Sequence, residues 1–291
     1  MNIKLALTKH IPDKIYLQLL YYKHFKKFID FKNPKTFNEK LQWLKLYDRK
    51  PEYTTMVDKY AVKKYVADII GEEYIIPTLG VWDSPEDIDF DALPNQFVLK
   101  WNHDSGSIVI CKDKSKLDRE NALNKMKRGK KYSGFWYGRE WPYKNVKPCI
   151  FAEAYMKDGE NEVLPVYKIM CFSGEPKIIQ AIQNDKQPNE SIDYFDVEWN
   201  LLKLKQNFPN SDQPLPKPEK LTEMLEIAKV LSKNISFLRV DLYMVNGAIA
   251  FSEHTFYSDA GLAKFHPDSW DEKIGNWIKL PEIQGEQVHN K

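Results

Sequence analysis

The sequence is poor in cysteine and contains no long apolar run. Its three cysteines, Cys111, Cys149 and Cys171, are odd in number and have no spacing typical of a metal site, which predicts free thiols in a reducing compartment. No stretch approaches the roughly 20 consecutive apolar residues of a membrane-spanning helix. The amino terminus lacks the apolar core and small-residue cleavage site of a secretory signal. We therefore expect a cytoplasmic protein without an integral membrane segment.

The net charge of +2 is unevenly distributed along the chain. Between Lys112 and Lys147 there are 12 Lys or Arg and 4 Asp or Glu, a local charge of +8, which leaves −6 on the remaining residues. A basic segment on an otherwise mildly acidic protein indicates one surface that meets an anion. Nucleic acid, a nucleotide phosphate and an acidic sugar all satisfy this requirement.

Helical signals dominate the first part of the chain and strand signals the rest. Apolar residues from Ile15 to Phe25 repeat at helical spacing, Thr36 with Glu39 forms a capping box, and Asp58 is placed to cap a further helix. Strands are expected at 97–100, 108–110, 148–156, 163–172 and 177–182, a loop at 207–218, a helix at 221–233 and a hairpin at 237–253. The pattern predicts an α+β protein with antiparallel sheets.

The hairpin carries three charged side chains whose orientation depends on its register. A two-residue Asn-Gly loop at 246–247 would pair Asp241 with Ser252 and turn Glu253 toward the apolar face. A three-residue loop ending in a left-handed Gly247 would instead pair Arg239 with Glu253, and would place Arg239, Asp241 and Glu253 on one face. Burying an unpaired Glu253 among apolar side chains costs roughly several kcal/mol. We therefore predict the three-residue loop.

Two carboxylates and an arginine on one sheet face suit magnesium and a nucleoside triphosphate. Mg²⁺ takes one or two carboxylates together with phosphate oxygens, and arginine clamps a transferring phosphoryl group. The alternative is a cross-strand ion pair of Arg239 and Glu253 on a solvated face, and the hairpin alone leaves both possibilities equally open.

Four motifs follow one another along the chain: Asp58-Lys59 before a helix, Phe97-Val98-Leu99-Lys100 before a Gly/Ser loop, Phe151-Ala152-Glu153-Ala154-Tyr155-Met156, and Arg239-Val240-Asp241 with Phe251-Ser252-Glu253-His254-Thr255. In this order they resemble the ATP-grasp superfamily. Segments 37–43, 139–143, 167–168 and 238–243 are similar, more narrowly, to the branch associated with teichuronopeptide biosynthesis, found in bacterial surface-polysaccharide gene clusters. The likeness runs from about Thr36 to Leu280.

This resemblance implies an ATP-grasp fold in which two α+β lobes sandwich ATP, preceded by a helical amino-terminal region. The expected divisions are a helical region at 1–94, a lid subdomain at 95–152 and a carboxyl-terminal subdomain with the metal-binding hairpin at 153–291. ATP and Mg²⁺ are the implied cofactors.

The resemblance also implies a role for each matching residue. The implied metal ligands are Asp241 and Glu253, and the implied catalytic residues are Arg239, at the γ-phosphoryl group, and Lys168, at a phosphate. The implied nucleotide contacts are Lys100 at the α- and β-phosphates, the backbone of Ser105, Gly106 and Ser107 over the β/γ end, and the adenine hinge Glu153, Ala154, Tyr155 and Met156, in which the main chain of Ala154 and Met156 reads the base. Glu162 is assigned to the ribose hydroxyls, with Glu160 as the competitor.

Other polar and aromatic residues receive ordinary structural interpretations. Lys59 is expected to be a solvated residue in a first helical turn, and the acids from Asp87 to Asp91 are expected to cap and solvate a helix start. The aromatic run 135–143 is typical of a core, with a substrate-facing role as the less favoured alternative. Arg139, inside the basic stretch 125–144, is expected to contact an acidic acceptor.

The predicted function is ATP-dependent ligation of a carboxylate to an amine through an acyl phosphate. The resemblance implies that an amino acid or peptide is joined to a uronic-acid-containing surface polysaccharide or its precursor, such as a capsule component. The alternatives are a glycosyltransferase, whose metal could lie at Asp87 to Asp91, and an ATP-dependent kinase. An RNA-binding protein is disfavoured, since no stacking sheet or groove-binding helix accompanies the basic segment. Nucleic acid is therefore not an expected partner.

Overall fold

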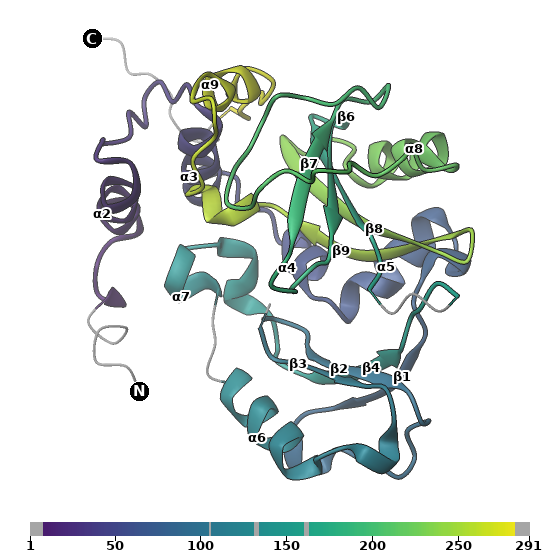
Figure 1. The fold of residues 1–291 in the computed structure, drawn as a ribbon. Helices are drawn as coiled ribbons and strands as arrows, with labels where there is room; N and C mark the ends of the chain where they lie inside the picture. Colours follow the sequence, from purple (N-terminus) through teal and green to yellow (C-terminus); the bar gives the residue numbers. More distant parts are fainter. Residues whose placement is uncertain (1–7, 105, 131–133, 160–162, 283–291) are drawn as a thin grey trace.

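The computed structural model describes residues 8–104, 106–130, 134–159 and 163–282, and these residues fold around two antiparallel sheets (Figure 1). The smaller sheet has the order β1-β4-β2-β3 and consists of β1 (Thr78–Trp82), β2 (Phe97–Trp101), β3 (Ile108–Cys111) and β4 (Ile150–Ala154). The larger has the order β7-β6-β5-β8-β9 and consists of β5 (Val166–Phe172), β6 (Glu175–Gln183), β7 (Ser191–Phe195), β8 (Phe237–Val245) and β9 (Ala248–Thr255). The α+β class with antiparallel sheets is thereby confirmed.

The helices of the amino-terminal part pack on other helices and, in part, on the larger sheet. They are α2 (Asp13–Phe25), α3 (Phe37–Tyr47), α4 (Glu52–Val57) and α5 (Ala61–Ile70). The predicted capping box of Thr36 and Glu39 is present at the start of α3. Phe37, the first residue of α3, enters the core, where its ring meets Phe237 of β8 edge-on, at 4.9 Å between centroids. The capping box thus fixes where the helix begins, and the contact between Phe37 and Phe237 packs it against the larger sheet.

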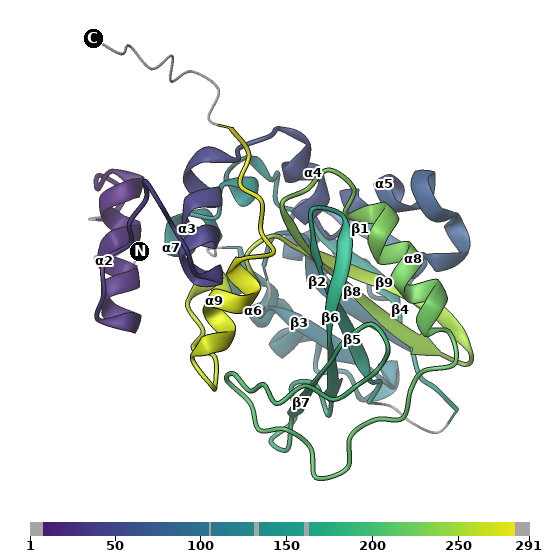
Figure 2. The ribbon, with the colours of Figure 1, turned by 90° about the horizontal axis from the view of Figure 1, so that it is seen from above.

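The remaining helices pack either on a sheet or on other helical segments. They are α6 (Arg119–Gly129), α7 (Gly134–Gly138), α8 (Leu221–Leu231) and α9 (Ser269–Gly275), with short 3-10 turns at Glu72–Tyr74, Pro85–Asp87, Lys114–Lys116, Trp141–Asn145 and Ser258–Gly261. Helix α6 lies under the smaller sheet, where the Trp101 indole donates to the carbonyl of Met126 at 2.8 Å. Helix α8 packs on β5, β6 and β8 of the larger sheet (Figure 2). Within the described residues, every helix is too short or too polar to cross a bilayer.

The β8–β9 hairpin reaches the predicted side-chain arrangement by a different route. Val245 pairs with Ala248, so the loop has two residues, and Asn246 and Gly247 both have positive φ values, 50° and 74°. The predicted three-residue loop is therefore wrong. A β-bulge makes Ser252 an extra residue in β9, and the bulge brings Glu253 opposite Asp241. Two positive φ values give a turn whose twist matches that of the strands, and the bulge spares Glu253 from the apolar face.

Arg139 is a structural anchor, which corrects the expectation that it contacts an acidic acceptor. Its side chain is wholly buried, and its backbone has a positive φ of 53°. The guanidinium lies 3.0 Å from the Asp13 carboxylate, donates to the carbonyl of Thr8 at 2.6 Å, and sits 4.2 Å from the centre of the Tyr16 ring. Because Asp13 is the first residue of α2, Arg139 ties that helix to the segment between α7 and the 3-10 turn after it.

We predict that Arg139→Ala lowers the free energy of unfolding by about 3 kcal/mol or more, because it leaves a partly buried carboxylate and several carbonyls without their partner. Urea unfolding followed by circular dichroism measures the change. Arg128→Ala, which removes an exposed arginine of α6, is the matched control and should change stability by less than about 0.5 kcal/mol. Equal stability of the two variants would contradict the anchoring role.

Candidate functional site

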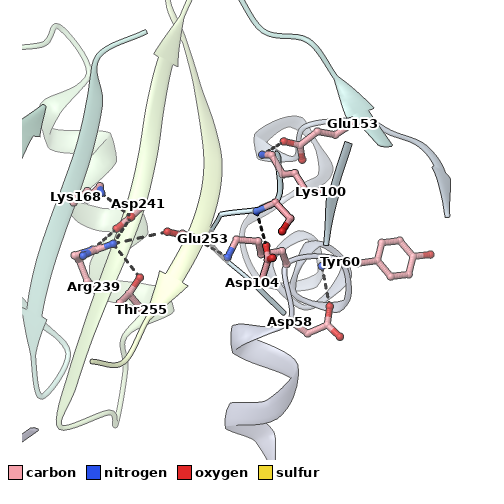
Figure 3. A network of polar contacts seen from close by, with 12 residues as sticks. Asp58, Tyr60, Lys100, Asp104, Glu153, Lys168, Arg239, Asp241, Glu253 and Thr255 are labelled. Atoms are coloured by element: carbon pink, nitrogen blue, oxygen red, sulfur yellow. Dashed lines mark hydrogen bonds and ion pairs between the residues drawn. The ribbon is translucent and has the colours of Figure 1, made fainter. Parts of the chain in front are cut away.

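A charged cavity of 410 Å³ lies between the two sheets. Strands β2 and β4 supply Lys100 and Glu153 from one side, and strands β5, β8 and β9 supply Lys168, Asp241 and Glu253 from the other (Figure 3). Its volume is within the roughly 300–1,000 Å³ of small-molecule sites. Because most of its lining side chains are charged or polar, the cavity suits a polyanion with its cations.

Arg239 organises the hairpin side of the cavity. Its guanidinium donates two hydrogen bonds to the Asp241 carboxylate, each of 2.7 Å, in the fork geometry that fixes both side chains. The same guanidinium donates to the hydroxyls of Thr255 and Ser258, each at 3.1 Å, and lies 3.8 Å from Glu253 Oε1. The arginine and both carboxylates therefore form one buried cluster.

Lys59 completes this cluster from another part of the chain, which corrects its interpretation as a solvated residue. Its ammonium lies 2.9 Å from Glu253 Oε2. The turn before α5 holds the lysine in place: the Asp58 carboxylate accepts hydrogen bonds from the N–H groups of Tyr60 and Ala61, and the Lys59 N–H donates to the carbonyl of Asn102 at 3.0 Å. The capping aspartate thus positions a lysine that spans the gap to the hairpin.

The cations keep Glu253 ionised despite its burial. Burial alone would raise the pKa of Glu253, but the Lys59 ammonium and the Arg239 guanidinium lower that pKa well below its usual range. Burial likewise opposes the charge on Lys59, yet Glu253 raises the pKa of Lys59. For Asp241, burial raises the pKa, while Arg239 and Lys168 oppose this effect. The cations of the site therefore oppose the effect of burial on both carboxylates.

A second ion cluster lies on the side of the cavity formed by the smaller sheet. The Glu153 carboxylate, on β4, accepts from Lys100 of β2 and lies 3.0 Å from the ammonium of Lys63 on α5. Burial alone would raise the pKa of Glu153, but Lys100 and Lys63 lower it. Lys63 also donates to the carbonyl of Ile76 at 2.6 Å. Two lysines therefore share one carboxylate, which leaves an excess of positive charge on this wall.

An apolar cavity of 580 Å³ continues from the charged one. The two cavities share part of their lining, including Lys100, Glu153 and Tyr243. The second cavity is lined mainly by apolar side chains: Ile76, Val98, Ile108, Ile110, Ala154, Tyr155, Met156, Val163, Leu164 and Val166. The N–H of Ala154 already donates to the carbonyl of Pro77 at 3.0 Å. A planar apolar group fits here beside the charged cavity.

The structure brings most of the predicted site residues together. Every predicted residue that the structure describes, except Ser107, lines one of the two cavities. The N–H of Ser107 donates to the Asp104 carboxylate at 3.2 Å, which closes the loop after β2. Ser105, Glu160 and Glu162 lie outside the described residues.

The chemistry of the carboxylates fits magnesium that arrives with phosphate. Among the described residues, no group of three or more His, Cys, Asp or Glu side chains is placed to hold a metal. Asp241 and Glu253, directly opposite each other on β8 and β9, offer two carboxylates to one cavity. Two carboxylates suffice for Mg²⁺ when phosphate and water oxygens fill the other positions. The acids considered for a glycosyltransferase metal do not line this cavity. Asp91 pairs with Arg119 at 2.6 Å, and the Asp89 carboxylate accepts a hydrogen bond from the N–H of Asp91.

A strained turn forms the far wall of the charged cavity, and no pattern in the sequence predicts it. Asp259 and Ala260 both have positive φ values, 48° and 54°, and both line the cavity. Helix α3 holds the turn in this conformation: Gln42 donates to the carbonyls of Ala260 and Gly261, and the buried Lys45 donates to that of Ala260 at 2.8 Å. The segment 37–43, noted for its resemblance, thus acts through these hydrogen bonds.

Glu140 also lines the charged cavity, and no role was predicted for it. It follows the buried Arg139, which fixes the backbone at this point. Burial raises the pKa of Glu140, while Lys45 and Lys59 oppose the rise. Within the part of the chain that the structure describes, its carboxylate makes no hydrogen bond or ion pair, so it is open to a ligand.

Comparisons place the chain among known proteins. The family model described as TupA-like ATPgrasp matches residues 39–279. No curated protein matches the sequence.

Several solved ligases are similar in structure. The D-alanine–D-alanine ligase from Bacillus anthracis complexed with ATP has a TM-score of 0.41 and 16% identity, with 69% of this chain and 54% of that chain covered. The D-alanine–D-alanine ligase from Helicobacter pylori has a TM-score of 0.44 and 14% identity, with 78% and 60% covered. The ATP-grasp ligase PsnB with minimal precursor, Mg and ADP has a TM-score of 0.39 and 12% identity, with 75% and 57% covered. The chain thus spans little more than half the length of these ligases.

We predict that Lys59→Met lowers the free energy of unfolding by about 3 kcal/mol at neutral pH, because Glu253 loses its nearest cation. The folded pKa of Glu253 lies below its unfolded value, so its contribution is complete above the unfolded pKa and is lost as the pH falls. Without Lys59 the glutamate takes up its proton at a higher pH. The difference in stability between variant and native protein should therefore shrink on acidification.

Urea unfolding at a series of pH values tests this dependence. Lys64→Met is the matched control, since Lys64 is an exposed lysine of the adjoining helix α5 and pairs with Asp68, four residues on. Its effect should stay below about 0.5 kcal/mol at every pH. A Lys59→Met protein as stable as the control would show that the Lys59–Glu253 ion pair does not contribute to the free energy of unfolding.

Proposed function

The chain belongs to the TupA-like ATP-grasp family, and we propose that it is an ATP-dependent ligase that joins a carboxylate to an amine and releases ADP and phosphate. The observation that carries the proposal is the cluster of Arg239, Asp241 and Glu253 at one wall of a charged cavity that continues into an apolar one. A nucleoside triphosphate has the same division, with a planar base at one end and a polyanion at the other.

The proposed nucleotide position follows from this division. The base would occupy the apolar cavity beside the main chain of Tyr155 and Met156, and Glu162 or Glu160 would bind the ribose. Lys100 would shift from Glu153 to the α- and β-phosphates, since Lys63 remains to neutralise that carboxylate. The backbone of Ser105 to Ser107 would cover the β/γ end.

The proposed phosphoryl-transfer region is the hairpin cluster. Asp241 and Glu253 would hold Mg²⁺, which, when bound, neutralises phosphate oxygens and favours attack at the γ-phosphorus. In the structure Arg239 and Lys59 neutralise these carboxylates. With Mg²⁺ as the counter-ion of the carboxylates, Arg239, Lys59 and Lys168 would be free to stabilise the charge of the γ-phosphoryl group.

The proposed reaction has two steps. A substrate carboxylate oxygen attacks the γ-phosphorus, the bond from that phosphorus to the β–γ bridging oxygen breaks, and ADP leaves. The amine nitrogen then attacks the acyl carbon of the acyl phosphate, inorganic phosphate leaves, and the nitrogen gives up a proton. The amine arrives as an ammonium and must lose a proton before its nitrogen can attack. We assign Glu140 to bind this ammonium and to accept that first proton, because its carboxylate faces the cavity and burial raises its pKa. The proton given up after attack passes to the leaving phosphate.

The proposed substrates are an amino acid or peptide and an acidic saccharide. Exposed lysines of the basic segment support an anionic acceptor, and Lys125 among them lines the apolar cavity. We propose that a uronic-acid-containing surface polysaccharide or its precursor is the acceptor and that the reaction takes place in the cytoplasm, where buried thiols such as Cys171 stay reduced.

We propose three functional regions: a helical region at 1–94, a lid at 95–152 and a carboxyl-terminal subdomain at 153–291. Strand β1 extends the lid sheet from the first region, because it pairs with β4. Lys59 and Lys63, from the first region, contact Glu253 of the third and Glu153 of the lid. The helical region would therefore hold both lobes around the nucleotide.

We predict that ATP with Mg²⁺ raises the melting temperature of the protein, since a ligand bound only by the folded state stabilises it by mass action. Glu253→Gln and Asp241→Asn should lose most of this shift and lower turnover by about a hundredfold or more. Thermal shift and ADP release are the measurements, with the melting temperature of each unliganded variant as its baseline. Asp89→Asn is the control and should behave as the native protein. An essential Asp89 with a dispensable Glu253 would place the metal elsewhere.

We predict that ADP and free phosphate appear together only when carboxylate and amine substrates are both present, without AMP or pyrophosphate. Hydroxylamine in place of the amine should give a hydroxamate, because an acyl phosphate reacts with any strong nucleophile. Mass spectrometry of the products and a phosphate assay test this. A stable phosphorylated product without an amide would instead identify a kinase that uses the same site.

A further inference from the structure

Helix α2 has two apolar faces, and only one of them is packed in the protein. Leu17 and Tyr21 are buried against the core. On the opposite side Ile15, Leu19 and Tyr22 follow one another at four- and three-residue spacing with 54%, 55% and 43% of their surface exposed. The helical periodicity expected from Ile15 to Phe25 is thus real, but part of it faces outward. We call Ile15, Leu19, Tyr22 and Phe28 the outer stripe.

The outer stripe is held in this orientation by specific contacts. Asp13 at the start of α2 pairs with Arg49 at 2.8 Å and with the buried Arg139 at 3.0 Å. Gln18 exchanges two hydrogen bonds with the main chain of Ile29, at 2.7 Å and 2.9 Å, which folds the following segment back on the helix. This return places the Phe28 ring, 65% exposed, in a stack on Tyr22 at 4.8 Å. These contacts keep the outer stripe facing away from the core. Helix α2 lies at the edge of the molecule in both views (Figures 1 and 2).

The surroundings of the stripe are strongly basic. Residues 9–35 contain seven lysines and two aspartates, a charge of +5, and one aspartate is already neutralised by the two arginines. Lys14, Lys23, Lys26 and Lys27 are exposed next to the stripe. Lys26 ends the helix in a left-handed conformation, with its ammonium 5.9 Å from the Tyr22 ring centre. Apolar side chains bordered by lysines form one continuous surface.

We propose that this surface docks the protein on an anionic lipid bilayer. An amphipathic helix with aromatic and aliphatic residues on one face and lysines beside them lies in the headgroup region, where the apolar side chains enter the acyl boundary and the lysines meet anionic headgroups. A second copy of the chain fits less well, because self-association through the stripe would bring two lysine-rich surfaces together. The contact is peripheral and does not depend on the proposed ligase activity.

The test is co-sedimentation of the full chain with vesicles of phosphatidylcholine alone and of phosphatidylcholine mixed with phosphatidylglycerol. We expect binding to the mixed vesicles, weak binding to the neutral ones, and release by added salt. The double variants Ile15→Ser/Leu19→Ser and Lys26→Glu/Lys27→Glu should each weaken binding to mixed vesicles by about tenfold or more, since the first removes inserted apolar surface and the second reverses two headgroup contacts.

Matched controls separate the stripe from general hydrophobicity and charge. Val230→Ser removes an exposed apolar side chain, 47% accessible, from α8, and Lys217→Glu/Lys233→Glu reverses two exposed lysines away from α2. Both should bind as the native protein does, and urea unfolding should show that all variants remain folded.

Three results would overturn the proposal: no binding to the mixed vesicles, equal binding to both vesicle types, or α2 variants that bind as the native protein does. A dimer in light scattering that Ile15→Ser/Leu19→Ser converts to a monomer, with vesicle binding unchanged, would assign the stripe to a second copy instead.

Discussion

Two carboxylates that face one largely buried cavity require cations close by, and Asp241 and Glu253 obtain theirs from different parts of the chain. Arg239 lies two residues before Asp241 on β8, whereas Lys59 comes from the turn before α5. An unpaired buried carboxylate destabilises a fold by roughly 3–5 kcal/mol. The pairing of Lys59 with Glu253 therefore connects the helical region to the hairpin, and it also sets the charge of the cavity. Stability and the proposed chemistry draw on the same side chains.

A second set of buried polar residues supports this arrangement from behind. Asn38, Gln42 and Lys45 lie on one side of α3 and donate to main-chain carbonyls between Ala260 and Ala263. The carbonyls of Ala260 and Gly261 belong to the 3-10 turn Ser258–Gly261, and side chains of α3 supply hydrogen bonds to them. The helix thereby fixes the strained turn that carries Asp259 into the cavity. The polar face of α3 thus acts as a scaffold for the wall of the site.

Sequence signals were sufficient where the physics is local. The capping box at Thr36, most strands of the two sheets and the position of the hairpin follow from short-range patterns. The burial of Lys59 could not be predicted, because its partner Glu253 is distant in sequence and a lysine after a capping aspartate is usually solvated. Arg139 was misassigned for the same reason: only the folded chain shows that Asp13 reaches it. Strand β7 and helix α9 were not anticipated either, since both are short and depend on tertiary contacts.

The bulge at Ser252 follows from the number of residues between Asp241 and Glu253. Residues 242–252, an odd number, separate Asp241 from Glu253, although a two-residue turn between regular strands places an even number between any two facing residues. One residue must therefore remain unmatched, and the Asn-Gly turn, closed by its own pair of positive φ angles, leaves room for it only in a strand. Counting residues between two side chains that must meet thus reveals a bulge before any coordinates do, provided that the turn type is known.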